Sequence, residues 1–519
     1  MQLDEYKQYD AIALRDLIRS GAVTAPEVEA VARHALDAAN RTLNALALPL
    51  FSPALEHAED GPLAGVPFLI KDSGPMAEGT PFSIGSRSLQ GVVATRDSDL
   101  MTRFRAAGLV TLGLTTVPEM AISFSTESVK HGPTRNPWDS QRGVGGSSGG
   151  AAAMVAAGAV PLAHGSDGAG SLRIPASCCG LVGLKPSRGR TPSGPGTGAS
   201  GLGMNCEFAL TRTVRDAAHL LDTIHGPRGD TADTAALAPP RDRYADEMMI
   251  CPARLKVAVT TRAWSGASVA AEVASATAQA AHVLEDLGHH VSDASPAIDW
   301  ADVVESAMGE MAAIAAPWLT TARQPPPDQL EAVSRRVLEQ SRKFTASDLR
   351  GALDAKTRVS RSVGKFFSGY DLLVTPTLGQ LPAPHGTLRY DEPRHTTKTW
   401  LQSLFDYGPF TAVFNIAGQP AISLPLVQSH RGLPIGVQFV AAHGREDLLL
   451  QVAAVLEKAM PWSDRRPMPI ATRREARRPI ATATSDLKRH AWHTAPPPPS
   501  GRQLRAACAV LDQPTDHRP

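Results

Sequence analysis

The sequence predicts an α/β protein with a large central sheet, mixed but mostly parallel, covered by helices on both faces. The chain has 519 residues, of which 43% are hydrophobic and 20% charged, so it can bury a large core. Short apolar runs alternate along it with segments of helical periodicity, which favours a sheet with helical connections. The sequence lacks a run of about 18 uncharged apolar residues, so we expect no membrane span.

Helices are expected first in the N-terminal segment. The spacing of its apolar residues predicts a helix that ends before Gly21. Residues 24–27 read TAPE, a capping box with a proline in the first turn, and predict the start of a second helix. A long alanine-rich helix is expected over residues 269–287, where Gly288 suits a C-cap.

Strands are expected at short apolar runs that turn residues bound. The first covers residues 66–70, reads VPFLI, and places Lys71 at its end. Helical segments between the runs would act as crossovers, which favours parallel neighbours. The other expected strands span residues 109–114, 160–163, 181–184, 255–260, 372–375, 421–424 and 435–440.

We expect residues 1–466 to form one large domain. Within it, residues 300–370 have a mainly helical pattern, interrupted by prolines at 325–327, and are expected to form an insertion or cover. Residues 467–519 are basic, rich in proline and without apolar periodicity. This composition predicts a disordered tail, and the lack of interleaved aromatic residues argues against a nucleic-acid-binding arm.

Charge and cysteine content exclude several function classes. The formal net charge is +1, which argues against nucleic acid or an anionic membrane as a partner. Five cysteines without a C-x-x-C pair fit neither a disulfide framework nor a zinc site, and no metal or cofactor is predicted. The first seven residues, MQLDEYK, lack the order of a signal peptide, so a cytoplasmic location is expected.

Two glycine-rich segments carry the chemistry that the sequence suggests. Residues 145–150 read GGSSGG, and residues 165–171 read GSDGAGS. A serine hydroxyl is a weak nucleophile until a base takes its proton. Glycines allow backbone N–H groups to approach a reacting atom and to bind an oxyanion. We therefore predict that Ser171, at the turn into a helix, is the nucleophile of a hydrolase.

Lys71 is the predicted base. Its position after a buried strand would lower its pKa toward neutrality, because burial disfavours the charged ammonium. Ser147 could relay the proton if Lys71 is too far from Ser171. A Ser-His-Asp triad is the alternative, but His164, which lies near Ser171 in sequence, is expected to be a packed residue at a strand end.

These segments resemble a known enzyme family. Residues 145–150, 165–175 and 179–186 are similar in order and spacing to the signature of the amidase signature family. The resemblance implies that family's fold and the hydrolysis of a small-molecule amide without a cofactor. Residues 164–190 and 441–451 further resemble members that open cyclic amides. The resemblance covers residues 1–466 and includes residues 136–138, 414–425 and 432–438.

The resemblance also implies roles for individual residues. Lys71 would be the general base, Ser147 the bridging serine with a cis peptide bond, and Ser171 the nucleophile that forms an acyl-enzyme. The oxyanion hole would consist of backbone N–H groups of Gly168, Ala169, Gly170 and Ser171. The family usually has glycine where this chain has Ala169, a change that removes no N–H group.

Two charged residues near the nucleophile have two possible roles. Asp167 and Arg173 would either support the catalytic residues from behind or form a purely structural ion pair. Residues 121–126, 200–207 and 300–340 are expected to shape the pocket, by their position alone. The family also suggests a homodimer.

Two alternative functions remain open on sequence grounds. The first is the glutaminase subunit of a tRNA-dependent amidotransferase, which shares the Ser–Ser–Lys core and needs partner subunits. The second is a non-catalytic scaffold on the same fold. The presence of Lys71, Ser147 and Ser171 argues against the scaffold.

Overall fold

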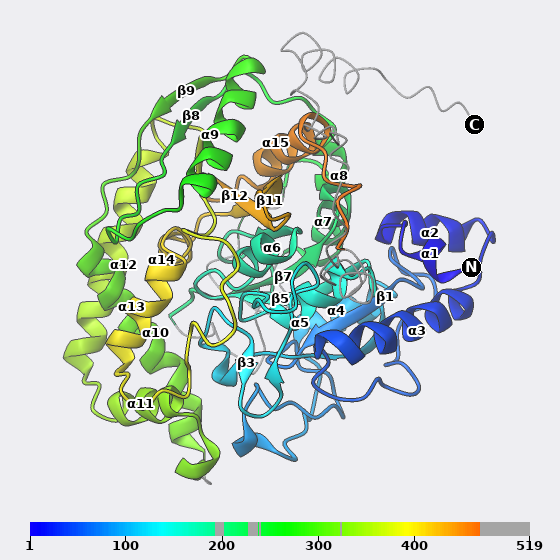
Figure 1. Ribbon diagram of the computed structural model, residues 1–519, viewed down its shortest axis with the longest axis horizontal. Coiled ribbons are helices and arrows are strands. Elements are labelled where there is room, and N and C mark those ends of the chain that lie inside the picture. Colours follow the sequence, from blue (N-terminus) through cyan, green and yellow to red (C-terminus); the bar gives the residue numbers. More distant parts are fainter. Residues whose placement is uncertain (193–201, 227–236, 238–239, 322–323, 468–519) are drawn as a thin grey trace, which may run out of the picture.

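The computed structural model describes residues 1–192, 202–226, 237, 240–321 and 324–467 of the chain. Helices surround a central eight-stranded sheet, with a separate pair of strands near the N-terminal helices (Figure 1). No helix in these ranges is long and apolar enough to cross a membrane. The longer helices are α2 Ala11–Arg19, α3 Ala25–Leu43, α4 Asp99–Ala106, α5 Gly149–Ala156, α6 Arg173–Cys179, α7 Val214–Ile224, α9 Ala271–Asp286, α10 Trp300–Thr320, α11 Ala332–Ser341, α12 Ala346–Phe366, α13 Thr397–Tyr407, α14 Ala412–Ala417 and α15 Glu446–Ala459; the short ones are α1 Leu3–Tyr6 and α8 Tyr244–Glu247.

The helix ends follow the local signals in the sequence. At the start of α3, Thr24 Oγ1 accepts the N–H of Glu27 at 3.3 Å, and Glu27 Oε2 accepts the N–H of Thr24 at 2.8 Å. This reciprocal pair confirms the predicted capping box. The predicted alanine-rich helix is α9, and it ends just before Gly288, whose φ of +98° suits glycine.

The central sheet has the strand order β5-β7-β6-β11-β12-β10-β8-β9. The predicted large mixed sheet is therefore confirmed. A second, two-stranded parallel sheet pairs β1 with β2, and a short antiparallel pair joins β3 to β4. The strands span β1 Pro67–Lys71, β2 Val110–Thr115, β3 Glu127–Ser128, β4 Gly132–Pro133, β5 Leu162–Asp167, β6 Val182–Lys185, β7 Cys206–Thr211, β8 Lys256–Val259, β9 His290–Asp293, β10 Leu372–Pro376, β11 Ala421–Gln428 and β12 Pro434–Ala441.

The direction of the strands corrects one part of the prediction, because the sheet is not mostly parallel. Each neighbouring pair from β5 to β10 is antiparallel, while β10–β8 and β8–β9 are parallel. The reason lies in the connections. A short loop links β11 to β12, which forces a hairpin, whereas helix α9 links β8 to β9 and allows a parallel pair.

Residues 300–370 are mainly helical, as predicted. They form α10, α11 and α12, and a 3-10 turn at Pro327–Gln329, which begins at the last of the three prolines, lies between α10 and α11. Helix α10 packs on α12, α11, α13 and α14, and this group of helices lies along one side of the molecule (Figure 1). The predicted division at residue 466 remains a prediction, because residues 468–519 lie outside the described part of the chain.

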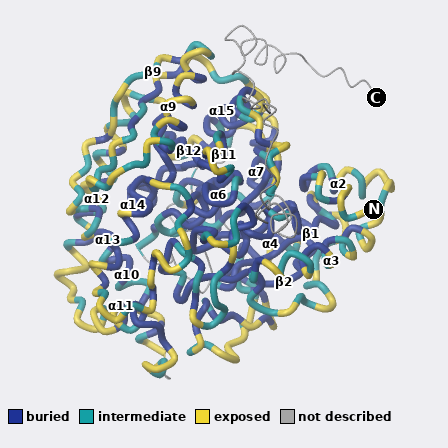
Figure 2. The backbone as a smooth tube through the Cα atoms, viewed as in Figure 1, coloured by how far each residue is buried: buried dark blue, intermediate teal, exposed yellow. Residues whose placement is uncertain are grey.

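The two glycine-rich segments lie at the centre of the molecule. Every residue of α5 and of α6 is buried (Figure 2). Helix α6 packs on β6, β11 and β12, and α5 packs on β5. A helix that is buried on all sides needs small or apolar residues, which the glycines and alanines of α5 provide. The core thus fixes the serines that precede each helix.

Candidate active site

Lys71 lies at the end of β1 and is completely buried. Its Nζ donates hydrogen bonds to Ser147 Oγ at 2.8 Å and to Ser166 Oγ at 2.7 Å. Burial lowers the pKa of Lys71 to about 8, although the charges of Glu207 and Asp167 oppose this shift. An amine with such a pKa has an appreciable neutral fraction near pH 7 and can accept a proton. The predicted burial of Lys71 is therefore confirmed.

Ser147 lies in the loop that leads into α5. The peptide bond between Gly146 and Ser147 is cis, as the family resemblance implied. Gly146 packs closely on the backbone of residues 123–125, because a Cβ at this position would lie 2.6 Å from the carbonyl oxygen of Ser123. Glycine is thus required beside Ser147, which explains part of the GGSSGG pattern.

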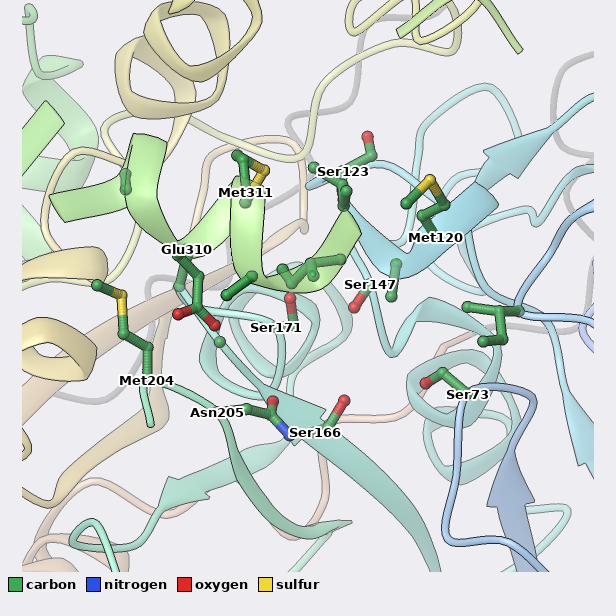
Figure 3. A pocket seen from close by; sticks show the side chains of 18 of the residues that line it. Ser73, Met120, Ser123, Ser147, Ser166, Ser171, Met204, Asn205, Glu310 and Met311 are labelled. Carbon is green, nitrogen blue, oxygen red and sulfur yellow. The ribbon is translucent and has the colours of Figure 1, made fainter. Parts of the chain in front are cut away.

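Ser171 occupies the turn between β5 and α6. Its side chain lines the main pocket, together with Ser147 and Ser166 (Figure 3). The carbonyl oxygen of Ser171 accepts the N–H of Ser148 at 3.3 Å, which ties the two serine loops together. Within the described residues, no hydrogen bond joins Ser147 Oγ to Ser171 Oγ. The structure therefore brings the predicted serines to one pocket wall without a direct bond between their hydroxyl groups.

In the turn before Ser171 the backbone N–H groups are free, whereas carbonyl groups of the turn accept hydrogen bonds from side chains. Thr411 Oγ1 donates to the Ala169 carbonyl oxygen at 2.6 Å, and Asn415 Nδ2 donates to the Asp167 carbonyl oxygen at 2.7 Å. The N–H groups of residues 168–171 have no hydrogen-bond acceptor among the described residues. Free, fixed N–H groups of this kind form a site for a negatively charged oxygen.

Glycine is needed at one position of this turn and not at its neighbour. Gly170 has a φ of +142°, and a Cβ there would lie 2.5 Å from Thr411 Oγ1. Ala169 is not among the residues with positive φ, so its methyl group causes no backbone strain. The departure of this chain from the usual family sequence at Ala169 therefore leaves the shape of the turn intact.

Asp167 and Arg173 form a fully buried ion pair behind the turn. Arg173 Nε and Nη2 donate to the two carboxylate oxygens of Asp167, each at 2.9 Å. Arg173 also donates to Gln438 Oε1 at 2.7 Å and to Asn415 Oδ1 at 2.6 Å. Burial opposes ionisation of Asp167, but the Arg173 guanidinium holds the pKa of that carboxyl well below its usual range. Neither residue lines the pocket, so the pair fixes the turn from behind.

Several polar residues near Lys71 were given no role from the sequence. Ser166, which lies inside the second glycine-rich segment, is the other acceptor for Lys71. His164 Nε2 lies 2.7 Å from Glu207 Oε2 and, as predicted, is a packed residue. Asn205 Nδ2 donates to the other oxygen of Glu207 at 2.6 Å. Glu207 and Asn205 lie on or beside β7, which was not predicted; they belong to the segment 200–207 that was expected to shape the pocket, but their contacts with His164 and with each other were not predicted.

The main pocket has a volume of about 690 Å³. Three segments were expected to shape it, residues 121–126, 200–207 and 300–340, and each contributes to its walls. The first contributes residues 121–124, the second Met204, Asn205 and Glu207, and the third several residues between Ala307 and Thr320. Helix α10 supplies more of the apolar lining residues than any other single helix or strand. The pocket is large enough for a compact organic molecule and opens directly onto Ser171.

The comparisons with known proteins agree with this geometry. A family model described as Amidase matches residues 8–450. The chain belongs to the amidase signature family. A 6-aminohexanoate-cyclic-dimer hydrolase of Paenarthrobacter ureafaciens is 40% identical over 481 residues, which cover 88% of this chain and 96% of that protein.

Solved structures of amidase signature enzymes share the fold. A 6-aminohexanoate cyclic dimer hydrolase complexed with substrate has a TM-score of 0.83 at 38% identity, with 89% of this chain and 99% of that one covered. A bacterial aryl acylamidase of the same family has a TM-score of 0.79 at 27% identity, with 88% and 97% covered. The amidase signature fold predicted from the sequence is thus confirmed.

The buried free thiols of this amidase are poor candidates for a catalytic nucleophile. Cys178, Cys179 and Cys206 are buried and free. Burial raises the pKa of Cys178 to about 12, and it raises the pKa values of the other two thiols as well. Such thiols are not nucleophiles at neutral pH. In the part of the chain that the structure describes, no group of three or more His, Cys, Asp or Glu side chains could hold a metal ion.

Proposed function

We propose that this amidase-family hydrolase cleaves a carboxamide to a carboxylate and an amine or ammonia through an acyl-Ser171 intermediate. One observation carries the proposal. Lys71, buried and with a lowered pKa, is hydrogen-bonded to Ser147 Oγ at the wall of the pocket that also contains Ser171. A base, a relay and a nucleophile that meet at a substrate-sized pocket are the parts that acyl transfer needs.

In the proposed acylation step, Ser171 Oγ attacks the amide carbon while its proton passes to Ser147, whose own proton passes to neutral Lys71. The carbonyl oxygen gains a negative charge, which the free N–H groups of residues 168–171 stabilise. The tetrahedral intermediate then loses the amine, which takes a proton back through Ser147. Water cleaves the acyl-Ser171 ester by the same route, releases the carboxylate and restores Ser171.

The pocket favours an amide with an extended apolar part. Its walls include Met120, Phe124, Met311, Trp318 and Leu404. Two relatives that share about two fifths of their residues with this chain bear the name 6-aminohexanoate-cyclic-dimer hydrolase. That cyclic dimer, an amide of two aliphatic chains, is therefore the first substrate that we propose.

The proposal predicts turnover of simple amides by the isolated protein. Purified enzyme should be incubated with 6-aminohexanoate cyclic dimer, a primary aliphatic amide, an anilide, a carbamate and glutamine, and released amine or ammonia should be measured. We expect hydrolysis of the cyclic or linear amides and little release of ammonia from glutamine. Hydrolysis of glutamine alone would favour the amidotransferase subunit. No hydrolysis of any amide by folded protein would contradict the proposal.

A further inference from the structure

Glu310 is a carboxylic acid in the mostly apolar wall that α10 contributes to the pocket. It is only 4% exposed and lines the pocket between Ala307, Met311 and Ile314. The proposed acyl-transfer chemistry has no use for a carboxylate there. A buried carboxylate is costly unless it is hydrogen-bonded or paired with a cation, so its surroundings need an explanation.

The hydrogen bonds of Glu310 leave half of its carboxylate unused. Oε2 accepts the N–H of Leu202 at 2.6 Å, and Oε1 has no partner among the described residues. Lys356 and Arg188 lie near enough for their charges to act on Glu310, but neither forms an ion pair with it. Lys356 donates to the Leu202 carbonyl oxygen, and Arg188 donates to the Gly203 carbonyl oxygen at 2.5 Å. Both cations are thus bound to the loop behind Glu310.

The pocket surface next to Glu310 also offers hydrogen-bond acceptors. Figure 3 shows the Glu310 carboxylate pointing from α10 into the pocket, on the side where Met204 and Asn205 lie. Asn205 uses its Nδ2 to donate to Glu207, so its Oδ1 remains an acceptor. The free backbone N–H groups of the pocket lie instead beside Ser171. One end of the pocket therefore suits a carbonyl oxygen, and the other suits an N–H group.

We propose that Glu310 determines specificity by accepting a hydrogen bond from a second N–H donor of the substrate, either an amine or a second amide. This inference rests on the proposed function, because it assumes that the reacting carbonyl group lies at Ser171. The ligand's N–H group would supply the partner that Glu310 Oε1 lacks among the described residues. Burial raises the pKa of Glu310 to about 7, and an N–H donor at Oε1 would favour the ionised form again.

The test measures binding in the Ser171→Ala variant, so that it does not depend on turnover. Calorimetric titration should compare 6-aminohexanamide, hexanediamide and heptanamide, which offer an ammonium, a neutral amide and a methyl group at the same distance from the first amide. The second variant is Ser171→Ala with Glu310→Gln. A glutamine that accepts the Leu202 N–H through Oε1 turns its NH₂ group toward the pocket, so an acceptor becomes a donor.

We expect the N–H ligands to bind the Ser171→Ala variant more tightly than heptanamide does, and Glu310→Gln to reduce that preference by about tenfold. The two N–H ligands distinguish an amine from an amide as the preferred group. Equal binding of all three ligands, or a preference that survives Glu310→Gln, would overturn the inference.

A matched control separates this role from a purely structural one. Glu457 is a partly buried glutamate of α15 whose Oε1 likewise accepts one backbone N–H, that of Val214, at 3.2 Å, and it does not line the pocket. Glu457→Gln should leave the ligand preference unchanged. If Glu310 only fixed Leu202, Glu310→Gln would keep the acceptor for the Leu202 N–H and leave the ligand preference unchanged, which would also overturn the inference. Failure of the proposed function would show separately, as a lack of hydrolysis by the enzyme with Ser171 intact.

Discussion

Replacement of Ser171 by alanine is expected to lower the rate of amide hydrolysis by about ten-thousand-fold, with the fold intact. The alanine removes the oxygen that would form the acyl-enzyme but leaves the N–H groups of residues 168–171 in place. Residual activity from these groups alone should be small. Steady-state hydrolysis of the amide that the enzyme cleaves best measures the loss, and circular dichroism checks the fold.

A serine elsewhere on the pocket wall provides the control for this loss. Ser73 also lines the pocket but has no hydrogen bond to Lys71, Ser147 or Ser171. We expect Ser73→Ala to change hydrolysis by less than about tenfold, because Ser73 lines the pocket without a hydrogen bond to the proposed catalytic residues. If Ser171→Ala kept activity comparable to that of Ser73→Ala, Ser171 would not be the nucleophile.

Replacement of Arg173 by methionine is expected to lower the free energy of unfolding by about 3–5 kcal/mol. Methionine keeps much of the side-chain volume but leaves the Asp167 carboxylate buried without its cation. The loss also removes the hydrogen bonds to Gln438 and Asn415 that join the turn to distant segments. Denaturant unfolding of wild type and variant, followed by fluorescence, measures the change.

The double variant Asp167→Asn with Arg173→Met tests whether the ion pair is the cause. Asparagine at 167 removes the uncompensated charge and can still accept the N–H of Leu172, which Asp167 Oδ2 accepts at 3.2 Å. We expect the double variant to be more stable than Arg173→Met alone, since only one partner's removal leaves a buried charge. The single variant Asp167→Asn completes the comparison. If the double variant lost as much free energy of unfolding as the two single variants together, the two charges would not be coupled.

Much of the fold and of the site was accessible from the sequence because the signals are local. The capping box at Thr24 and Glu27, the helix end at Gly288 and the buried strand before Lys71 each depend on adjacent residues. The same holds for the two glycine-rich segments, since glycine is required where backbones approach closely, as at Gly146, or where φ is positive, as at Gly170.

The remaining features depend on residues that are distant in the sequence. Strand direction was predicted wrongly because it follows from which runs pair in space, and a mainly antiparallel sheet contains the same apolar runs as a parallel one. Arg173 donates hydrogen bonds to Gln438 and Asn415, which lie more than two hundred residues away in the sequence. Glu310 lies within an ordinary helical pattern, and only the packing of α10 on the pocket shows that it is buried.

The activation of Ser171 by Lys71 is tested most directly by the rate at which a serine-reactive fluorophosphonate labels the enzyme, measured from about pH 6 to about pH 10. Peptide mapping should find the label on Ser171. Because the neutral form of Lys71 takes the proton, the rate for the wild type should rise with pH through the lysine pKa of about 8. Lys71→Ala should label at least about a hundredfold more slowly and lose this rise. A label on another residue, or an equal rate without Lys71, would contradict the Ser–Ser–Lys assignment.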